Sequence, residues 1–321
     1  AGALCGRSSQ DCRVMSLVRL ENVSKYLGGK PILENVAFRV EEGEKVGLIG
    51  RNGTGKTTVF RLIQGEYEPD SGVIERMRRA RTACLDQMPI LRPNATIFDV
   101  VMDMFRDVIE MEKGLGRLEE EIAGTEGGGV GHDELLRRYG VLQDEFVRRG
   151  GYEFRINAKR VLHGLGFTSE DFDLPMHALS GGQRTRLMLA LVLLQDADLL
   201  LLDEPENHLD LQAREWLEAF LQETPKGVVI ISHDRRMLNA VTKRIVEVER
   251  GALTSYSGNY DYYNGQKALV REQQRKEFEQ QQEFIEKETK WINRFRYKNT
   301  KASQVQSRIK RLEKMERVEA P

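Results

Sequence analysis

The fold of this chain is decided by one stretch of sequence, Gly50-Arg51-Asn52-Gly53-Thr54-Gly55-Lys56-Thr57. It follows a short apolar run at 45–49 that predicts a buried strand, and it leads into a helix-like pattern at 56–64. A glycine-rich turn in this position directs the N–H groups of a helix N-terminus toward an anion. The spacing GxxxxGK(S/T) therefore predicts a phosphate-binding loop in an α/β domain.

Each residue type in this P-loop has a task that follows from its chemistry. Backbone N–H groups cradle phosphate oxygens, the Lys56 ammonium reaches the β and γ phosphates, and the Thr57 hydroxyl ligates Mg²⁺. A glycine-rich turn that only connects a strand to a helix is the alternative, and the flanking patterns make it the weaker one. The predicted ligands are ATP and Mg²⁺, and the predicted nucleotide contacts are Gly50, Arg51, Asn52, Gly53, Thr54, Gly55, Lys56, Thr57 and Thr58.

A pair of carboxylates follows a second apolar run, at 199–202. Asp203 is suited to bind Mg²⁺, and Glu204 is suited to polarise an attacking water. Taken alone, the pair could equally be an acidic loop after a strand. Its meaning changes when it is seen together with Leu179-Ser180-Gly181-Gly182-Gln183, about twenty residues earlier.

This LSGGQ stretch resembles the signature motif of ATP-binding cassettes, the ABC family, and it has the family's spacing to the Asp-Glu pair. Gln87 matches the family's Q-loop, and His233 in Ser232-His233-Asp234 matches its switch histidine. A lone glutamine or histidine is more often structural, but the motifs occur together and in order. The chain thus resembles an ABC-type P-loop NTPase over nearly all of residues 16–263.

The resemblance implies roles for residues that the spacing alone does not assign. Glu204 is implied as the general base, His233 as a γ-phosphate contact, and Gln87 as a catalytic residue that senses metal and water. The family's adenine-stacking aromatic falls at Leu27, so either Tyr26 substitutes for it or the stacking is weaker. The other implied positions are the metal ligands Thr57, Gln87 and Asp203, the signature contacts Ser180, Gly181, Gly182 and Gln183, and Asp210, which faces a second cassette.

Three segments are similar to the ABC-F branch of the family. Residues 204–210, Glu-Pro-Glu-Asn-His-Leu-Asp, are similar to its EPTNHLD motif, with Glu206 in place of threonine. Residues 257–263 and 291–310 resemble its first-cassette exit and its inter-cassette linker. This implies an ATPase that acts on the ribosome and contacts tRNA or rRNA. It also implies a second cassette as partner, in a missing C-terminal half or in a homodimer.

The composition divides the chain into three parts. Residues 1–15 are expected to be a disordered extension, 16–263 the cassette, and 264–321 a basic helical hairpin. A helical subdomain is expected at about 92–190, interrupted by a flexible glycine run at 127–131. In the hairpin, apolar residues recur at helical spacing, with the turn expected at Asn299, Thr300 and Ser303. They are Val270, Phe278, Phe284, Ile285, Trp291, Ile292 and Phe295 on one side of the turn and Val305, Ile309 and Leu312 on the other.

The formal net charge of -1 conceals a strongly basic segment. Residues 290–317 carry ten basic and two acidic side chains, a balance of +8 that leaves -9 for the remainder. Cations beside Trp291, Phe295 and Tyr297 favour RNA contact over a merely solvated coiled coil. The predicted RNA contacts are Arg294, Arg296, Lys298 and Lys301.

Other classes of protein fit the sequence less well. No window approaches the roughly 18 uninterrupted apolar residues of a membrane span, so we expect a cytoplasmic protein without membrane insertion. The three cysteines form no CxxC motif, which disfavours a disulfide framework or a zinc site. The ATPase subunit of a membrane transporter is the alternative function, although such subunits do not normally carry this hairpin. In chromosome and DNA-repair ATPases, the coiled coil interrupts the cassette instead of following it.

Overall fold

The computed structural model describes residues 16–85, 95–124, 130–295 and 302–315. The chain divides after Asn259 into a cassette unit and a helical unit that begins at Tyr260. The division precedes 264, where the composition changes, because helix α9 (Tyr260–Phe295) already includes Tyr260. The expected extension at 1–15, Gln87 and the expected turn at Asn299 and Thr300 lie outside the described residues.

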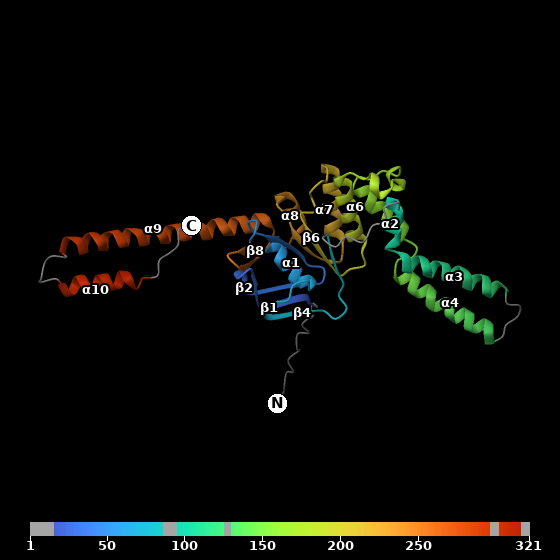
Figure 1. Ribbon diagram of the computed structural model, residues 1–321, viewed down its shortest axis with the longest axis horizontal. Coiled ribbons are helices and arrows are strands. Elements are labelled where there is room, and N and C mark those ends of the chain that lie inside the picture. Colours follow the sequence, from blue (N-terminus) through green and yellow to red (C-terminus); the bar gives the residue numbers. More distant parts are fainter. Residues whose placement is uncertain (1–15, 86–94, 125–129, 296–301, 316–321) are drawn as a thin grey trace, which may run out of the picture. The chain divides into compact units, whose positions relative to one another are not determined.

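A six-stranded sheet forms the centre of the cassette unit (Figure 1), with the strand order β5-β6-β7-β3-β8-β9. The first five strands of this order are parallel, and β9 is antiparallel to β8. The predicted strands at 45–49, 199–202 and 228–231 all belong to this sheet, and their apolar side chains are buried. The strands are β3 (Lys45–Ile49), β5 (Thr82–Cys84), β6 (Leu199–Asp203), β7 (Gly227–Ile231), β8 (Arg244–Glu249) and β9 (Ala252–Ser257).

A smaller antiparallel sheet has the order β2-β1-β4. Its strands are β1 (Ser16–Leu27), β2 (Lys30–Glu41) and β4 (Ser71–Arg76). The predicted helix α1 (Lys56–Gln64) shares one hydrophobic core with both sheets. Leu62 of α1, Leu33 of β2 and Leu48 of β3 are each fully buried in this core. This core fixes α1 against β3 and so fixes the loop between them.

Helices make up the region from 97 to 194, as expected for the helical subdomain. Helices α3 and α4 lie side by side and enclose a separate core with Val108, Leu115, Phe146 and Phe154 (Figure 1). Gly131, the end of the expected flexible run, lies inside α4, and 127–129 are outside the described residues. The helices are α2 (Ile97–Asp103), α3 (Arg106–Gly124), α4 (Val130–Arg148), α5 (Phe154–Gly164) and α6 (Gly181–Leu194), followed beyond β6 by α7 (Leu211–Glu223) and α8 (Arg235–Val241), with short turns η1 (Asp171–Asp173) and η2 (Met176–Ala178) between α5 and α6.

The helical unit contains α9 and α10 (Ala302–Glu313), which pair as expected for a hairpin. Ile292 and Val305 are buried between them, and Glu288 accepts two hydrogen bonds from the Arg308 guanidinium at 2.8 and 2.9 Å. Ser303, expected in the turn, lies within α10. Val270, expected in the apolar stripe, is 54% exposed. A 12-residue helix is only about 18 Å long, so α10 covers only part of the 36-residue α9.

None of the helices in the described ranges is both long enough and apolar enough to cross a membrane.

Lys45 provides a test of the cassette core. Its side chain is only 5% exposed, and its ammonium group donates hydrogen bonds to the carbonyl oxygens of Thr224 and Lys226. Burial lowers the pKa of Lys45 to about 8, and the charge of Lys243 lowers it further. Between pH 8 and 10 the native state therefore holds fewer protons at this site than the unfolded state does, so raising the pH stabilises the fold.

We expect the free energy of unfolding of the wild type, relative to Lys45→Met, to rise by up to roughly 3 kcal/mol between pH 7.5 and 10. Urea unfolding of both proteins across this range measures the difference. Lys30→Met, which removes an exposed lysine, controls for the loss of one charge. If the difference in the free energy of unfolding between the wild type and Lys45→Met stays constant with pH, the pKa of Lys45 is not lowered by burial.

Candidate active site

The P-loop connects the end of β3 to the start of α1, and two of its glycines are required by geometry. Gly55 adopts a φ of 107°, and a Cβ there would lie 2.8 Å from Cγ2 of Ile32. A Cβ at Gly50 would lie 2.6 Å from the carbonyl oxygen of Val248 on β8. A side chain at either position would thus force the backbone to move. The glycines allow the loop to turn tightly against both sheets.

Lys56 holds the loop together from inside. Its side chain is 8% exposed, and Nζ donates hydrogen bonds to the carbonyl oxygens of Gly50 at 2.8 Å and Arg51 at 3.1 Å. The Thr54 hydroxyl donates to the same Arg51 oxygen at 2.9 Å. The first N–H groups of a helix have no intrahelical acceptor. Lys56 and the N-terminus of α1 thus form a positive site for phosphate.

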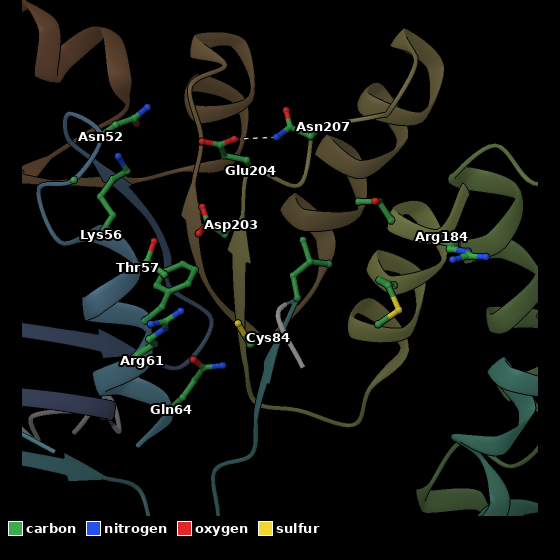
Figure 2. Close-up of a pocket in the computed structure, with 15 residues that line it drawn as sticks. Asn52, Lys56, Thr57, Arg61, Gln64, Cys84, Arg184, Asp203, Glu204 and Asn207 are labelled. Carbon is green, nitrogen blue, oxygen red and sulfur yellow. Dashed lines mark hydrogen bonds between the residues drawn. The ribbon is translucent and has the colours of Figure 1, made fainter. Parts of the chain in front are cut away.

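A cavity of about 710 Å³ opens beside this loop. Figure 2 shows Lys56 and Thr57 on one side, Arg184 on the opposite side, and Asp203 and Glu204 between them. The structure therefore brings together six residues that the sequence singled out: Asn52, Gly53, Lys56, Thr57, Asp203 and Glu204.

Sequence reasoning missed several residues of the cavity. Phe60 and Gln64 follow Lys56 at intervals of four, and Arg61 follows Thr57 at the same interval. Residues four apart share one face of a helix, so helical spacing could have identified them. Arg184 and Thr185 directly follow the signature motif and Met188 lies four residues after Arg184 on one helix, so the same spacing applies to them. Cys84, Leu85 and Asn207 come from separate parts of the chain and carry no such signal.

Glu204 and His233 meet at the carboxyl edge of the sheet. Glu204 follows β6 and His233 follows β7, and the two strands are neighbours. His233 Nε2 lies 3.4 Å from Glu204 Oε1, while the Asn207 side-chain amide donates to Glu204 Oε2 at 2.9 Å (Figure 2 shows this second contact). The predicted base is thus oriented by two neighbours, one of which, Asn207, sequence reasoning did not identify.

The backbone of Glu204 is itself constrained. Its φ of 46° is in the left-handed region, which costs a residue with a side chain about 1 kcal/mol or more. Its N–H donates to the carbonyl oxygen of Ile231 at 2.8 Å, and its carbonyl accepts from Asn207 N–H at 3.1 Å. These contacts hold the chain in a turn that directs the carboxylate to the cavity (Figure 2).

The donor set of the cavity suits magnesium. Thr57 and Asp203 supply a hydroxyl and a carboxylate oxygen to the same cavity. Mg²⁺ prefers oxygen ligands and typically takes few from protein, the rest coming from phosphates and water. In keeping with this, the described ranges contain no cluster of three or more His, Cys, Asp or Glu side chains able to form an all-protein metal cage.

The signature residues lie at a second helix N-terminus, that of α6. Ser180 caps this helix: its hydroxyl accepts from Gln183 N–H at 3.2 Å, and the Gln183 side chain accepts from Ser180 N–H at 3.0 Å. A Cβ at Gly181 would meet nothing within 4 Å, which leaves room for a ligand. Within the part of the chain that is described, residues 180–183 do not line the cavity that contains Lys56.

Two further predicted residues also lie outside the cavity lining. Asp210 caps α7, where its carboxylate accepts from Ala213 N–H at 2.8 Å. Tyr26 is 46% exposed near the end of β1 and pairs with Pro31 of β2. The next residue of β2, Ile32, contacts the P-loop at Gly55. Tyr26 and Leu27 therefore lie near the loop but on a separate hairpin, and their contact with adenine stays a prediction.

Comparison with known proteins agrees with this geometry. A family model described as ABC transporter matches residues 33–207, and a second model with the same description matches 246–321. The chain is 34% identical over 305 residues to an uncharacterized ABC transporter ATP-binding protein, YfmM, of Bacillus subtilis, with 95% of the chain and 58% of that protein covered. It is 39% identical over 318 residues to ABC transporter F family member 2 of Arabidopsis thaliana, with 96% and 46% covered.

The chain thus spans about half the length of the curated relatives it matches. Among solved structures it is similar in fold to a dimeric bacterial ABC transporter cassette, with a TM-score of 0.51 and 21% identity over 75% of the chain and 98% of that cassette. This chain combines that cassette fold with the P-loop, the carboxylates after β6 and the signature helix. The chain therefore belongs to the ABC transporter family and carries its ATP-binding cassette, an ATPase cassette.

Proposed function

We propose that this chain is the first cassette and linker of an ABC-F type protein that hydrolyses ATP and acts on the ribosome. The observation that carries the proposal is the paired helical unit α9–α10, with its basic segment, directly after a completed cassette. The identity to an F family member supports the same branch. In this proposal the hairpin contacts tRNA or rRNA and the cassette controls it through ATP.

The cavity residues divide the chemistry among them. Lys56 and the N–H groups of the P-loop bind the phosphates. Glu204 takes a proton from the attacking water, and His233, 3.4 Å away, contacts the γ-phosphate. Thr57 and Asp203, with Gln87, would hold Mg²⁺, which supplies positive charge to the phosphates. Gln87 lies outside the described residues.

A second cassette completes the site in this proposal. Ser180, Gly181, Gly182 and Gln183 open a helix N-terminus away from the lining of their own chain's cavity, so they are available to the γ-phosphate of another cassette. Asp210 and the start of α7 would face the same partner. The dimeric cassette of similar fold supports this arrangement. Either a second cassette of the same protein or a second copy of this chain could supply the partner surface.

Two cations of the hairpin lie over aromatic rings of the same hairpin. The guanidinium of Arg308 lies over the Trp291 ring at 4.1 Å and pairs with Glu288, and Arg311 lies over Phe284 at 5.3 Å. These cation–π contacts engage aromatic faces within the hairpin. We assign the RNA contact to the four cations that the sequence predicted: Arg294, in the last turn of α9, and Arg296, Lys298 and Lys301, which lie outside the described residues.

Lys56→Ala tests the nucleotide site. Loss of a charged donor to phosphate should weaken ATP binding by about 1.5–3 kcal/mol, which is roughly tenfold to 150-fold in affinity. Titration with a fluorescent ATP analogue, with ATP as competitor, measures the affinity. Lys30→Ala, an exposed lysine on β2, is the control. An unchanged affinity in Lys56→Ala contradicts the assignment of the P-loop.

Glu204→Gln tests the base. Glutamine keeps the size and the hydrogen bonds of the side chain but cannot take the proton, so hydrolysis should slow by about 10²–10⁴-fold while ATP affinity is retained. Phosphate release is measured in a preparation that self-associates or includes a second cassette. Glu42→Gln, an exposed acid between β2 and β3, is the control. Hydrolysis near the wild-type rate in Glu204→Gln refutes the role of the base.

The tip of the hairpin tests the ribosomal role. Each phosphate that a cation neutralises releases counterions, so ribosome binding should weaken with salt by a log-log slope of about -0.7 to -0.9 per contact. In a Glu204→Gln background, changing Arg294, Arg296, Lys298 and Lys301 to Ala should flatten this slope and reduce ribosome co-sedimentation. ATP affinity should not change, because the cassette is a separate unit.

The matched control removes four exposed cations from the α9 shaft instead: Arg271, Arg275, Lys276 and Lys287. Three of these pair with acids one turn away, namely Glu279, Glu272 and Glu283. If ribosome co-sedimentation falls equally in both variants, the effect is one of general charge, which counts against a specific RNA contact at the tip. Retention of the tip variant equal to its parent at every salt concentration overturns the RNA contact. If the chain is instead the ATPase subunit of a membrane transporter, neither the parent nor any of these variants is expected to co-sediment with the ribosome.

A further inference from the structure

Glu206 is a buried acid that the ATPase chemistry described above does not use. It lies two residues after Glu204 and is only 6% exposed. Burying a carboxylate is costly unless hydrogen bonds satisfy it. Its Oε1 accepts from the Ser232 hydroxyl at 2.5 Å and from His233 N–H at 3.2 Å. Among the described residues, its buried Oε2 has no hydrogen-bond partner.

The two bonds of Oε1 join separate loops. Glu206 belongs to the loop after β6, which carries Glu204, whereas Ser232 and His233 follow β7. The network continues through Ser232, whose hydroxyl also accepts from Asp234 N–H at 2.9 Å. Asp234 in turn caps α8 by accepting from Arg236 N–H at 2.8 Å. One carboxylate oxygen therefore links the loop of Glu204 to the start of α8.

The position of this link matters for the site. The two strands pair as far as Asp203 and Ile231, so beyond them the loops diverge from the sheet. Glu206 accepts a hydrogen bond from the backbone N–H of His233, and the ring nitrogen of His233 lies 3.4 Å from Glu204. The threonine of the similar motif has a shorter side chain with a single oxygen. Glu206 is long enough to place an acceptor between Ser232 and His233.

We propose that Glu206 is a positioning residue of the ATPase reaction and acts through His233. By binding Ser232 and the backbone of His233 it sets the distance between the histidine ring and the Glu204 carboxylate. What it supplies is a hydrogen-bond acceptor at Oε1, and it does not line the cavity that contains Lys56. The inference rests on the proposed roles of Glu204 and His233.

Three substitutions distinguish a residue that supplies a hydrogen-bond acceptor from one that only occupies volume in the core. Glu206→Gln keeps an acceptor oxygen of the same reach and offers its amide at the position of the unpartnered Oε2. Glu206→Ala removes the acceptor and leaves two donors unpaired. Ser232→Ala removes one donor from the opposite loop with little loss of volume, so it serves where Glu206→Ala fails to fold. Thermal unfolding followed by circular dichroism establishes which variants are folded.

The kinetic test compares kcat and KM for ATP in these variants, in His233→Ala, and in the double variant Glu206→Ala/His233→Ala. We expect Glu206→Ala to lower kcat by about tenfold or more and to change KM by less than about twofold, because the P-loop that binds the phosphates is unaltered and only the contact of His233 with the reacting γ-phosphate is displaced. Glu206→Gln should retain kcat within about threefold, because the geometry of the acceptor is preserved. The double variant should be no slower than His233→Ala alone, since two residues that act as one unit are non-additive.

A measurement that needs no turnover accompanies the kinetics. The chain contains five histidines, so the ¹⁵N spectrum of the imidazole rings can resolve His233, identified by the loss of its signal in His233→Gln. We expect Glu206→Ala and Ser232→Ala to shift the His233 signals, and Glu206→Gln to leave them near the wild type. His163, whose Nδ1 contacts the Phe167 carbonyl oxygen at 2.9 Å within the helical subdomain, is the internal reference and should not shift.

The outcomes are distinguishable. Three results would each overturn the inference. The first is that the reductions of kcat in Glu206→Ala and His233→Ala add up in the double variant, and the second is that Glu206→Gln reduces kcat as much as Glu206→Ala does. The third is that Glu206→Ala leaves the His233 signals unshifted. An inactive wild type, or normal hydrolysis in Glu204→Gln, instead counts against the proposed function. The histidine spectrum still tests Glu206 in that case, because it reports the orientation of His233 without hydrolysis.

Discussion

The ammonium group of Lys56, enclosed by the carbonyl oxygens of Gly50 and Arg51, is the contact on which the nucleotide site depends. It closes the loop around a positive charge at the N-terminus of α1, where anions are favoured. The loop can close this tightly because Gly50 and Gly55 have no side chain to collide with Val248 and Ile32. The buried face of α1, in a core shared by two sheets, then holds that N-terminus in place.

The parallel sheet extends this constraint to the rest of the site. Strands β3, β6 and β7 end at one edge, so the loops that follow them converge, although β3 ends at Ile49 and β6 begins only at Leu199. This topology brings Glu204 and His233 to the same edge, and the left-handed backbone of Glu204 is held by hydrogen bonds to Ile231 and Asn207. Buried polar groups such as Glu206 can then link the loops, because each bond gains strength away from water.

The helical unit is stabilised in a different way. Ile292 and Val305 form a short buried seam between α9 and α10, and Arg308 reinforces this pairing by contacting both Glu288 and Trp291. An arginine can do both because its planar guanidinium forms two hydrogen bonds in its plane and stacks through its face. Much of α9 beyond this seam has exposed charges, paired one turn apart along the helix.

The sequence by itself determined the local elements that carry the chemistry. The strand at 45–49 and the helix at 56–64 were predicted to the residue, because a continuous apolar run and a glycine-rich turn are local signals. The motifs also identified Lys56, Thr57, Asp203 and Glu204, which the structure brings into one cavity. The hairpin was predictable for the same reason, since helical periodicity is readable over a few turns.

Only the tertiary structure decided which distant residues meet. Glu206 on Ser232, His233 beside Glu204 and Arg184 in the cavity depend on strand order and on side-chain reach, neither of which leaves a periodic pattern in the sequence. Tertiary contact also decided that Val270 is exposed, because burial along α9 requires a partner and α10 is too short to provide one there. Periodicity specifies the face that a helix can bury, whereas burial itself is a property of two elements in contact.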